Sequence, residues 1–134
     1  MTIEIEPQSP GHQAFLEVQR ERLGQLTAFL DREFPDPTGV VLEIGCGHGH
    51  YLTAYAEQHP EANCVGIDLV SKRIRKGCQK RDKRTLPHLH FIKAEVTEFM
   101  AVWPKRLSLE RVFILFPDPW PKTRHTKNRI IQTA

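Results

Sequence analysis

The chain has 134 residues, enough for one domain with a hydrophobic core and too few for two. Hydrophobic residues make up 40% of it and charged residues 26%, with a net charge of +3, a balance that excludes an intrinsically disordered chain. The sequence has neither an apolar run of the roughly 20 residues that span a membrane nor the start of a secretory signal, so we expect a cytoplasmic protein with no membrane partner.

Helices and strands are predicted to alternate along the chain. After a polar lead-in, hydrophobic residues at helical spacing predict a helix over residues 12–34, which Pro35 and Pro37 end. Short apolar runs predict strands at residues 40–44, 64–67, 89–92 and 111–116. Between these strands, helices are predicted at residues 50–59, 72–83 and 95–103, and Ser71 would cap the second of them.

This alternation predicts an α/β fold with a parallel sheet, because parallel strands need a helical crossover between them. Right-handed crossovers place the carboxyl ends of the strands at one edge, where ligands bind in such folds. We divide the chain into an N-terminal lead-in and helix, residues 1–39, and an incomplete Rossmann-like domain, residues 40–134.

A glycine-rich loop follows the first strand. Gly45 and Gly47 allow a tight turn and a close approach of the backbone to a ligand, and Gly49 lets the next helix begin close to the sheet. The spacing is G-x-G-x-G, whereas dinucleotide-binding folds use G-x-G-x-x-G to aim a helix N-terminus at a pyrophosphate. This spacing counts against a nicotinamide or flavin site, which is the nearest rival interpretation. A turn without a ligand is the plainest one.

Carboxylates stand at the ends of the first three predicted strands. Glu43 lies just before the glycines, where it favours a cationic ligand and disfavours a pyrophosphate. Asp68 ends the second strand, where a carboxylate can accept both hydroxyl groups of a ribose. Glu95 follows the third strand and can face an adenine amino group. With Gly45 and Gly47 they predict a site for S-adenosylmethionine, which carries a sulfonium cation and no phosphate.

Cysteines and histidines do not indicate a metal site. The cysteines are odd in number, without a Cys-x-x-Cys pair, and the histidine pairs have no carboxylate or cysteine ligand beside them. Basic residues gather at 72–84 and again at 122–129. Such clusters can bind polyanions, although a solvated helix face explains the first of them equally well.

The segment after the fourth strand carries the most specific motif. Its prolines each fix φ and remove a backbone donor, and Asp118 stands between two of them beside Trp120. Residues 117–129, PDPWPKTRHTKNR, resemble the signature of the bacterial tRNA (guanine-N7)-methyltransferase family, which reads close to F-P-D-P-W-x-K-x-R-H-x-K-R-R. Three shorter motifs fall in the same order as in that family, so the resemblance covers residues 40–134: EIG at 43–45, GID at 66–68 and AE at 94–95.

The resemblance implies a class I S-adenosylmethionine-dependent methyltransferase fold, truncated after the fourth strand. It also implies methyl transfer to N7 of a guanine in the variable loop of tRNA. Carried over by position, it implies that Glu43, Asp68, Glu95 and Asp118 line the cofactor site and that Asp118 is the catalytic residue. Lys122 would contact the substrate. The basic stretch beyond it would contact RNA: Arg124, His125, Lys127 and Arg129.

The chain departs from the family pattern at Glu95, where aspartate is usual, and at Asn128, where arginine is usual. Family members also continue through three more strands beyond Ala134. Two other functions stay open: a non-catalytic module that binds S-adenosylmethionine, and a class I methyltransferase with a small-molecule acceptor. Because a fifth strand usually covers the fourth, we expect residues 112–116 to form an unpaired apolar edge, which favours self-association or a disordered tail.

Overall fold

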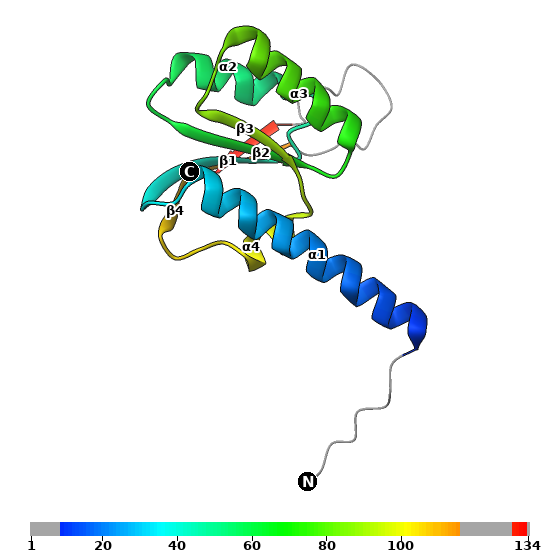
Figure 1. Cartoon of the computed structure of the whole chain (residues 1–134). Coiled ribbons are helices and arrows are strands. Elements are labelled where there is room, and N and C mark those ends of the chain that lie inside the picture. Colours follow the sequence, from blue (N-terminus) through cyan, green and yellow to red (C-terminus); the bar gives the residue numbers. More distant parts are fainter. Residues whose placement is uncertain (1–8, 116–129, 134) are drawn as a thin grey trace.

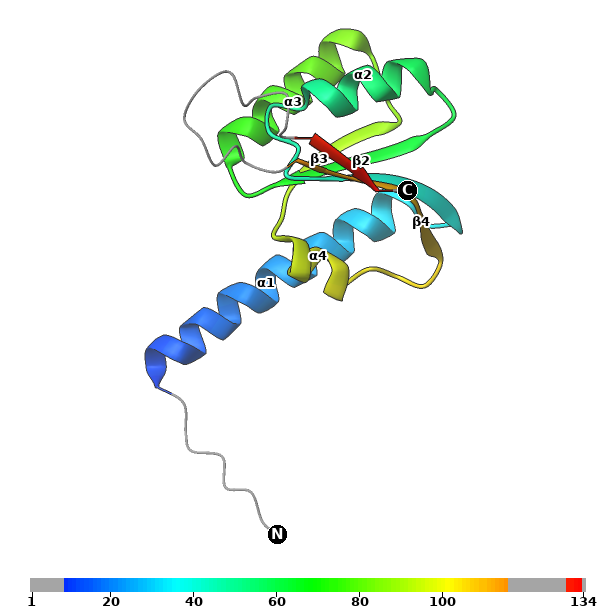
Figure 2. The same cartoon turned by 180° about the vertical axis from the view of Figure 1, so that it is seen from behind.

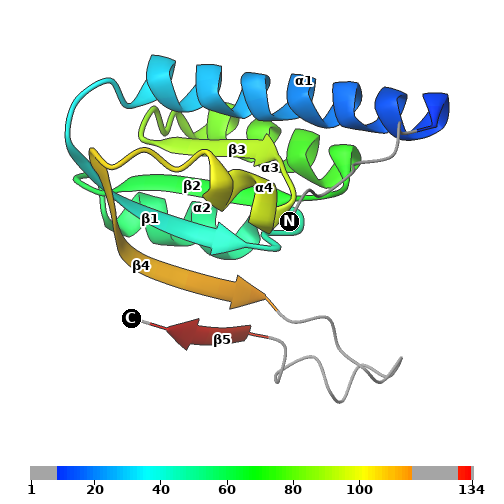
Figure 3. The same ribbon diagram turned by 90° about the horizontal axis from the view of Figure 1, so that it is seen from below.

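The computed structural model describes residues 9–115 and 130–133 (Figure 1). The elements in chain order are α1 (Pro10–Glu33), β1 (Thr38–Ile44), α2 (His50–Gln58), β2 (Asn63–Asp68), α3 (Ser71–Arg84), β3 (Leu89–Lys93), α4 (Val96–Ala101), β4 (Leu107–Leu115) and β5 (Ile130–Thr133). The strands form one sheet in the order β3-β2-β1-β4-β5. The first four run parallel, as the sequence predicted, and β5 runs antiparallel to β4 (Figure 3).

Helices cover both faces of the sheet. Figures 1 and 2 show α2 and α3 over one face and α1 and α4 over the other. Side chains of β1 alternate between the two layers, because successive residues of a strand point to opposite faces. Val40 and Leu42 pack in the cluster that includes α1 and α4, and Val41 packs with α2. The strand is therefore buried on both faces, which explains its continuous apolar sequence.

The second half of α1 belongs to the hydrophobic core. Leu26, Phe29 and Leu30 are buried in the same cluster as β1 and β2. At the end of the helix, the Arg106 guanidinium donates to the carbonyl oxygens of Leu30 and Phe34, at 3.2 and 2.7 Å. These bonds tie the end of α1 to the segment before β4, in addition to the bond from the Phe34 N–H to the Leu30 carbonyl oxygen. The N-terminal helix is thus packed against the sheet, and a domain boundary at residue 39 stays a prediction.

One aromatic ring fills a space that three glycines leave open. Phe91 of β3 lies against Gly49 at the start of α2, Gly66 of β2 and Gly77 of α3. A Cβ atom at any of these glycines would come within 2.6 to 2.9 Å of the ring. Both helices can therefore approach the sheet closely only because these positions carry no side chain.

Three details differ from the sequence-based expectations. Ser71 does not cap α3, because Val70 occupies the cap position and no side chain caps the helix. β4 begins at Leu107 rather than at residue 111, and its pairing with β1 shifts at Glu110, where a bulge interrupts the apolar pattern. α4 is confined to residues 96–101, since Glu95 caps it instead of beginning it.

The predicted unpaired edge of β4 is wrong. Val112 to Leu115 pair in antiparallel register with Thr133 to Ile130, so the same chain supplies the neighbouring strand. Residues 130–133 are therefore ordered as a strand, and the predicted self-association stays a prediction. Among the described helices, none is long and apolar enough to cross a membrane.

The packing of Phe91 predicts opposite effects for two helical glycines. Gly77→Ala in α3 should destabilise the protein, because the new Cβ would lie 2.9 Å from the Phe91 ring. Gly24→Ala in α1 should stabilise it by about 1 kcal/mol, because a Cβ there meets no atom within 4 Å and alanine favours helix. Chemical unfolding of both variants measures the difference. Equal stabilisation by the two substitutions would contradict this account of the packing.

Candidate functional site

The glycine loop lies at the carboxyl edge of the sheet, between β1 and α2. Gly45, Gly47 and Gly49 have φ values of 71°, 58° and 79°, in the left-handed region where other residues are strained. The backbone N–H groups of Gly45 and Cys46 both donate to the carbonyl oxygen of Ile67, at 2.9 and 3.0 Å. These bonds hold the loop against the end of β2, where the next site residue stands.

Asp68 ends β2 and joins the glycine loop directly. One carboxylate oxygen accepts the N–H of Gly47 at 3.0 Å, and the other accepts the N–H of Val70 at 2.9 Å. The guanidinium of Arg73 lies 3.7 Å from the second oxygen. Because each carboxylate oxygen can accept two hydrogen bonds, Asp68 keeps acceptor capacity for a ligand. The structure therefore brings together two of the predicted site residues, Gly47 and Asp68.

Glu43 is a buried carboxyl group near the end of β1. Its side chain is 1% exposed, and one of its oxygens has no hydrogen-bond partner among the described residues. In the sheet it stands between Gly66 of β2 and Phe113 of β4. Burial raises the pKa of Glu43 to about 8, since the carboxylate loses its hydration. An unpaired buried acceptor is rare in proteins, and a cationic group beside it would relieve its cost.

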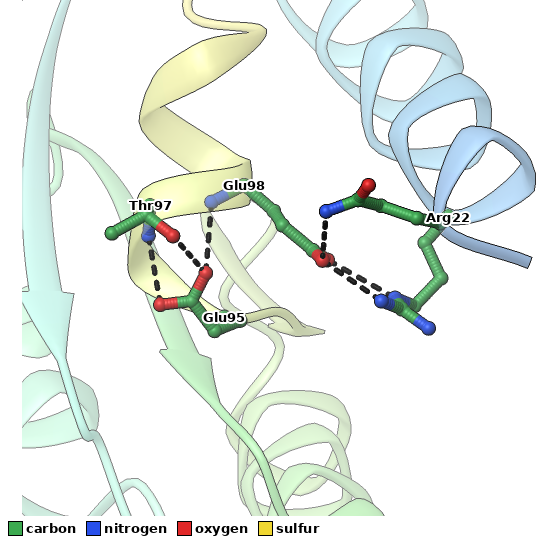
Figure 4. A network of polar contacts seen from close by, with 5 residues as sticks. Arg22, Glu95, Thr97 and Glu98 are labelled. Carbon is green, nitrogen blue, oxygen red and sulfur yellow. Dashed lines mark hydrogen bonds and ion pairs between the residues drawn. The ribbon is translucent and has the colours of Figure 1, made fainter. Parts of the chain in front are cut away.

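Glu95 caps α4, two residues beyond the end of β3 (Figure 4). Its two carboxylate oxygens accept the N–H groups of Thr97 and Glu98, both at 3.0 Å, and one also accepts the Thr97 hydroxyl. These hydrogen bonds, that from the Thr97 hydroxyl first, lower the pKa of Glu95. The carboxylate is thus held at the edge of the sheet, with much of its acceptor capacity used by the helix.

A pocket of about 590 Å³ lies between α1 and the carboxyl ends of β2 and β3. It is lined by Arg22, Gln25, Leu26, Leu69, Ile92, Lys93, Ala94, Glu95 and Glu98. Apolar side chains and a few fixed polar groups are typical of small-molecule sites. Leu69 follows Asp68 directly and is 63% exposed, so the pocket continues the site from the end of β2 toward Glu95.

Hydrogen bonds between α1 and α4 join residues that line this pocket. The Arg22 guanidinium of α1 makes two hydrogen bonds to the Glu98 carboxylate of α4, at 3.0 and 2.8 Å (Figure 4).

Sequence reasoning missed Arg22 and Leu69, because neither lies in a motif. It also missed Lys80 of α3, whose ammonium group donates to the carbonyl oxygen of His48 in the glycine loop at 2.9 Å.

Part of the predicted site lies outside the described residues. This holds for the predicted catalytic residue and for the predicted substrate and RNA contacts: Asp118, Lys122, Arg124, His125, Lys127 and Arg129. Within residues 9–115 and 130–133, no group of three or more His, Cys, Asp or Glu side chains could hold a metal ion.

Comparison with known proteins identifies the family. Residues 37–134 match a family model described as "Putative methyltransferase". The chain is 30% identical to a tRNA (guanine-N(7)-)-methyltransferase of Brevibacillus brevis, covering 72% of this chain and 45% of the relative. It is 36% identical to the enzyme of the same name from Syntrophotalea carbinolica, over 73% of this chain and 42% of the relative. The corresponding enzyme of Alkalilimnicola ehrlichii is 37% identical, over 77% of this chain and 44% of the relative.

Solved structures agree on the fold. The crystal structure of monomeric WbdD superposes with a TM-score of 0.50 at 14% identity, covering 86% of this chain and 33% of that chain. The predicted class I methyltransferase fold of α/β type is confirmed. The chain spans less than half the length of the three curated relatives named above. With 98 of its residues inside the family match, from 37 to 134, it belongs to this methyltransferase family.

Proposed function

We propose that this chain is the cofactor-binding part of a cytoplasmic tRNA (guanine-N7)-methyltransferase that uses S-adenosylmethionine. The observation that carries the proposal is the junction of the glycine loop with Asp68, beside the unpaired buried carboxyl of Glu43. The names of the relatives support the choice of acceptor.

The described residues fit this cofactor in charge and in shape. Glu43 is a buried carboxyl group that can release its proton and become the counter-charge of a cationic ligand, and the acceptor capacity left on Asp68 suits the hydroxyl groups of a ribose. The pocket includes apolar side chains, Leu26, Leu69 and Ile92, that suit a flat adenine base, and Glu95 also lines it. When bound, S-adenosylmethionine supplies an electrophilic methyl group on a sulfonium ion.

The acceptor chemistry needs little from the protein beyond positioning. Guanine N7 bears a lone pair and no proton, so no general base has to deprotonate it. Transfer is then an in-line displacement whose rate depends on orientation. We assign Asp118 to the guanine, where a carboxylate can accept the N1–H and N2–H₂ edge and stabilise the positive charge that develops on the ring. Lys122 and the basic residues beyond it, Arg124, His125, Lys127 and Arg129, would contact the RNA.

Binding without transfer is the alternative function, because the chain covers 45% or less of the length of two curated relatives. Calorimetric titration with S-adenosylmethionine, followed by a methyl-transfer assay on an unmodified tRNA transcript, separates the two. Binding together with N7 methylation supports the proposal, and binding without methylation supports a non-catalytic module. Salt-independent methylation of a small molecule, with no affinity for tRNA, would favour a different class I methyltransferase.

Replacement of the Asp68 carboxylate should weaken cofactor binding. Asp68→Asn keeps one acceptor for the neighbouring N–H groups but removes the charge, so we expect the affinity for S-adenosylmethionine to fall by about ten- to a hundredfold. The matched control is Asp36→Asn, an exposed carboxylate in the turn before β1. Titration calorimetry measures both variants. Equal affinities for the two would exclude Asp68 from the cofactor site.

The buried carboxyl of Glu43 should make the ligand-free protein less stable as the pH rises. Between pH 4.5 and 8 the folded state holds a proton that the unfolded state has lost. The free energy of unfolding should therefore fall across this window, by about 1.4 kcal/mol per pH unit, from a value fully present below pH 4.5. Glu43→Gln should remove this dependence and stabilise the ligand-free protein at pH 8, while it weakens cofactor binding.

Chemical unfolding at a series of pH values, repeated with the cofactor, measures both effects. Glu61→Gln is the matched control, since Glu61 is exposed and lies in the loop between α2 and β2. If Glu43→Gln and Glu61→Gln show the same pH dependence as the unchanged protein, the buried carboxyl does not govern stability.

A further inference from the structure

α3 concentrates positive charge on the outer side of the α2–α3 layer. Its 14 residues include a single acidic one, Asp82. The basic residues of the helix are Lys72, Arg73, Arg75, Lys76, Lys80, Arg81, Lys83 and Arg84. The helix is anchored on its opposite side, where Gly77 is buried against Phe91 and Ile74 and Cys78 pack on the same cluster.

The basic residues divide into two groups by their contacts. One group is engaged by the protein itself: Arg73 pairs with Asp68, Arg84 with Glu57, Arg81 with Asp82, and Lys80 donates to His48. These contacts fix the helix beside the glycine loop. They also mean that these cations are not available in full to an external partner.

The other group forms a ridge on the exposed side of the helix. The α3 ridge consists of Lys72, Arg75, Lys76 and Lys83, which are exposed and form no ion pair within the described residues. At 100° per residue these positions fall within about a third of the helix circumference, opposite Gly77 and Cys78. The ridge extends for about 16 Å along the helix axis.

We infer that the α3 ridge binds the phosphate backbone of the RNA substrate, an inference that rests on the proposed function. A row of flexible cations without internal partners is suited to phosphates, whose contacts position a nucleic acid without reading its sequence. A membrane surface fits less well, because a helix that lies on a membrane presents apolar residues beside its cations. On α3 the apolar residues Ile74 and Cys78 are directed into the core instead.

The position of the ridge relates it to the cofactor site. α3 begins at the carboxyl edge of the sheet, three residues after Asp68, and Lys72 stands at that end. Lys83 stands at the far end of the helix. When the reacting base of an RNA lies at the cofactor edge, the neighbouring backbone can extend along α3. Its phosphates would then contact the ridge at a distance from the reacting base.

The test removes the two ridge cations farthest from Asp68 and compares them with a matched pair. Lys76→Gln/Lys83→Gln alters the ridge, and Arg20→Gln/Lys105→Gln removes two exposed cations from α1 and from the loop before β4. Both double variants change the net charge equally, and glutamine maintains helix propensity. The probe is an unmodified tRNA transcript at several salt concentrations, and S-adenosylmethionine affinity is measured in parallel by calorimetry.

We expect the ridge variant to bind tRNA roughly three- to tenfold more weakly at moderate salt, with the slope of log K against log salt reduced by about 1–2. The control pair should bind nearly as the unchanged protein does, both variants should bind the cofactor normally, and Lys76→Arg/Lys83→Arg should restore tRNA binding. Equal weakening of the two glutamine variants would show that net charge, and not the ridge, sets the affinity.

Other results would overturn the inference in distinguishable ways. If the ridge variant binds tRNA as the control does, the ridge proposal fails while the proposed function stands. If the unchanged protein binds the cofactor but no tRNA, both proposals fail. Loss of binding to phosphatidylserine vesicles in the ridge variant, with tRNA binding unaffected, would assign the ridge to a membrane surface.

Discussion

The packing of Phe91 against three glycines is the constraint on which the site depends. The ring occupies the space between β3, β2 and the two helices of one layer, and it does so only because Gly49, Gly66 and Gly77 carry no side chains. Gly49 also completes the loop that contacts Asp68. The contact that brings α2 and α3 onto the sheet thus also sets where the glycine loop lies. The same contacts therefore contribute to the stability of the fold and determine the position of the glycine loop.

Glu43 shows the opposite relation between stability and function. A carboxyl group buried at 1% exposure, with an unpaired oxygen, contributes nothing to the core that an apolar residue would not contribute better. A carboxyl group in this place has a role where a cationic ligand binds beside it, because the ligand favours the carboxylate form. The raised pKa of Glu43 reflects the free-energy cost of burying its carboxylate form.

Much of the fold and part of the site could be predicted from sequence, because they depend on local patterns. Apolar runs identified the four parallel strands, and carboxylates at strand ends predicted Glu43 and Asp68 as site residues, of which the structure shows Asp68 bonded to the glycine loop. β5 was missed, because its four residues, which follow a basic stretch, are too few to show the alternating hydrophobic pattern of a strand. Arg22, Leu69 and Lys80 were missed because their roles arise from packing between distant segments. The single glycines Gly66 and Gly77 likewise become meaningful only beside Phe91.

The antiparallel pairing of β5 has a consequence for the segment between it and β4. Leu115 and Ile130 stand opposite each other in the register, so the chain leaves the sheet and returns to it at a single point, the carboxyl end of β4. Asp118 follows Leu115 by three residues, and a fully extended chain of that length spans at most about 11 Å. Both ends of the intervening segment are therefore held at the carboxyl edge of the parallel strands, beside the end of β1 where the glycine loop begins.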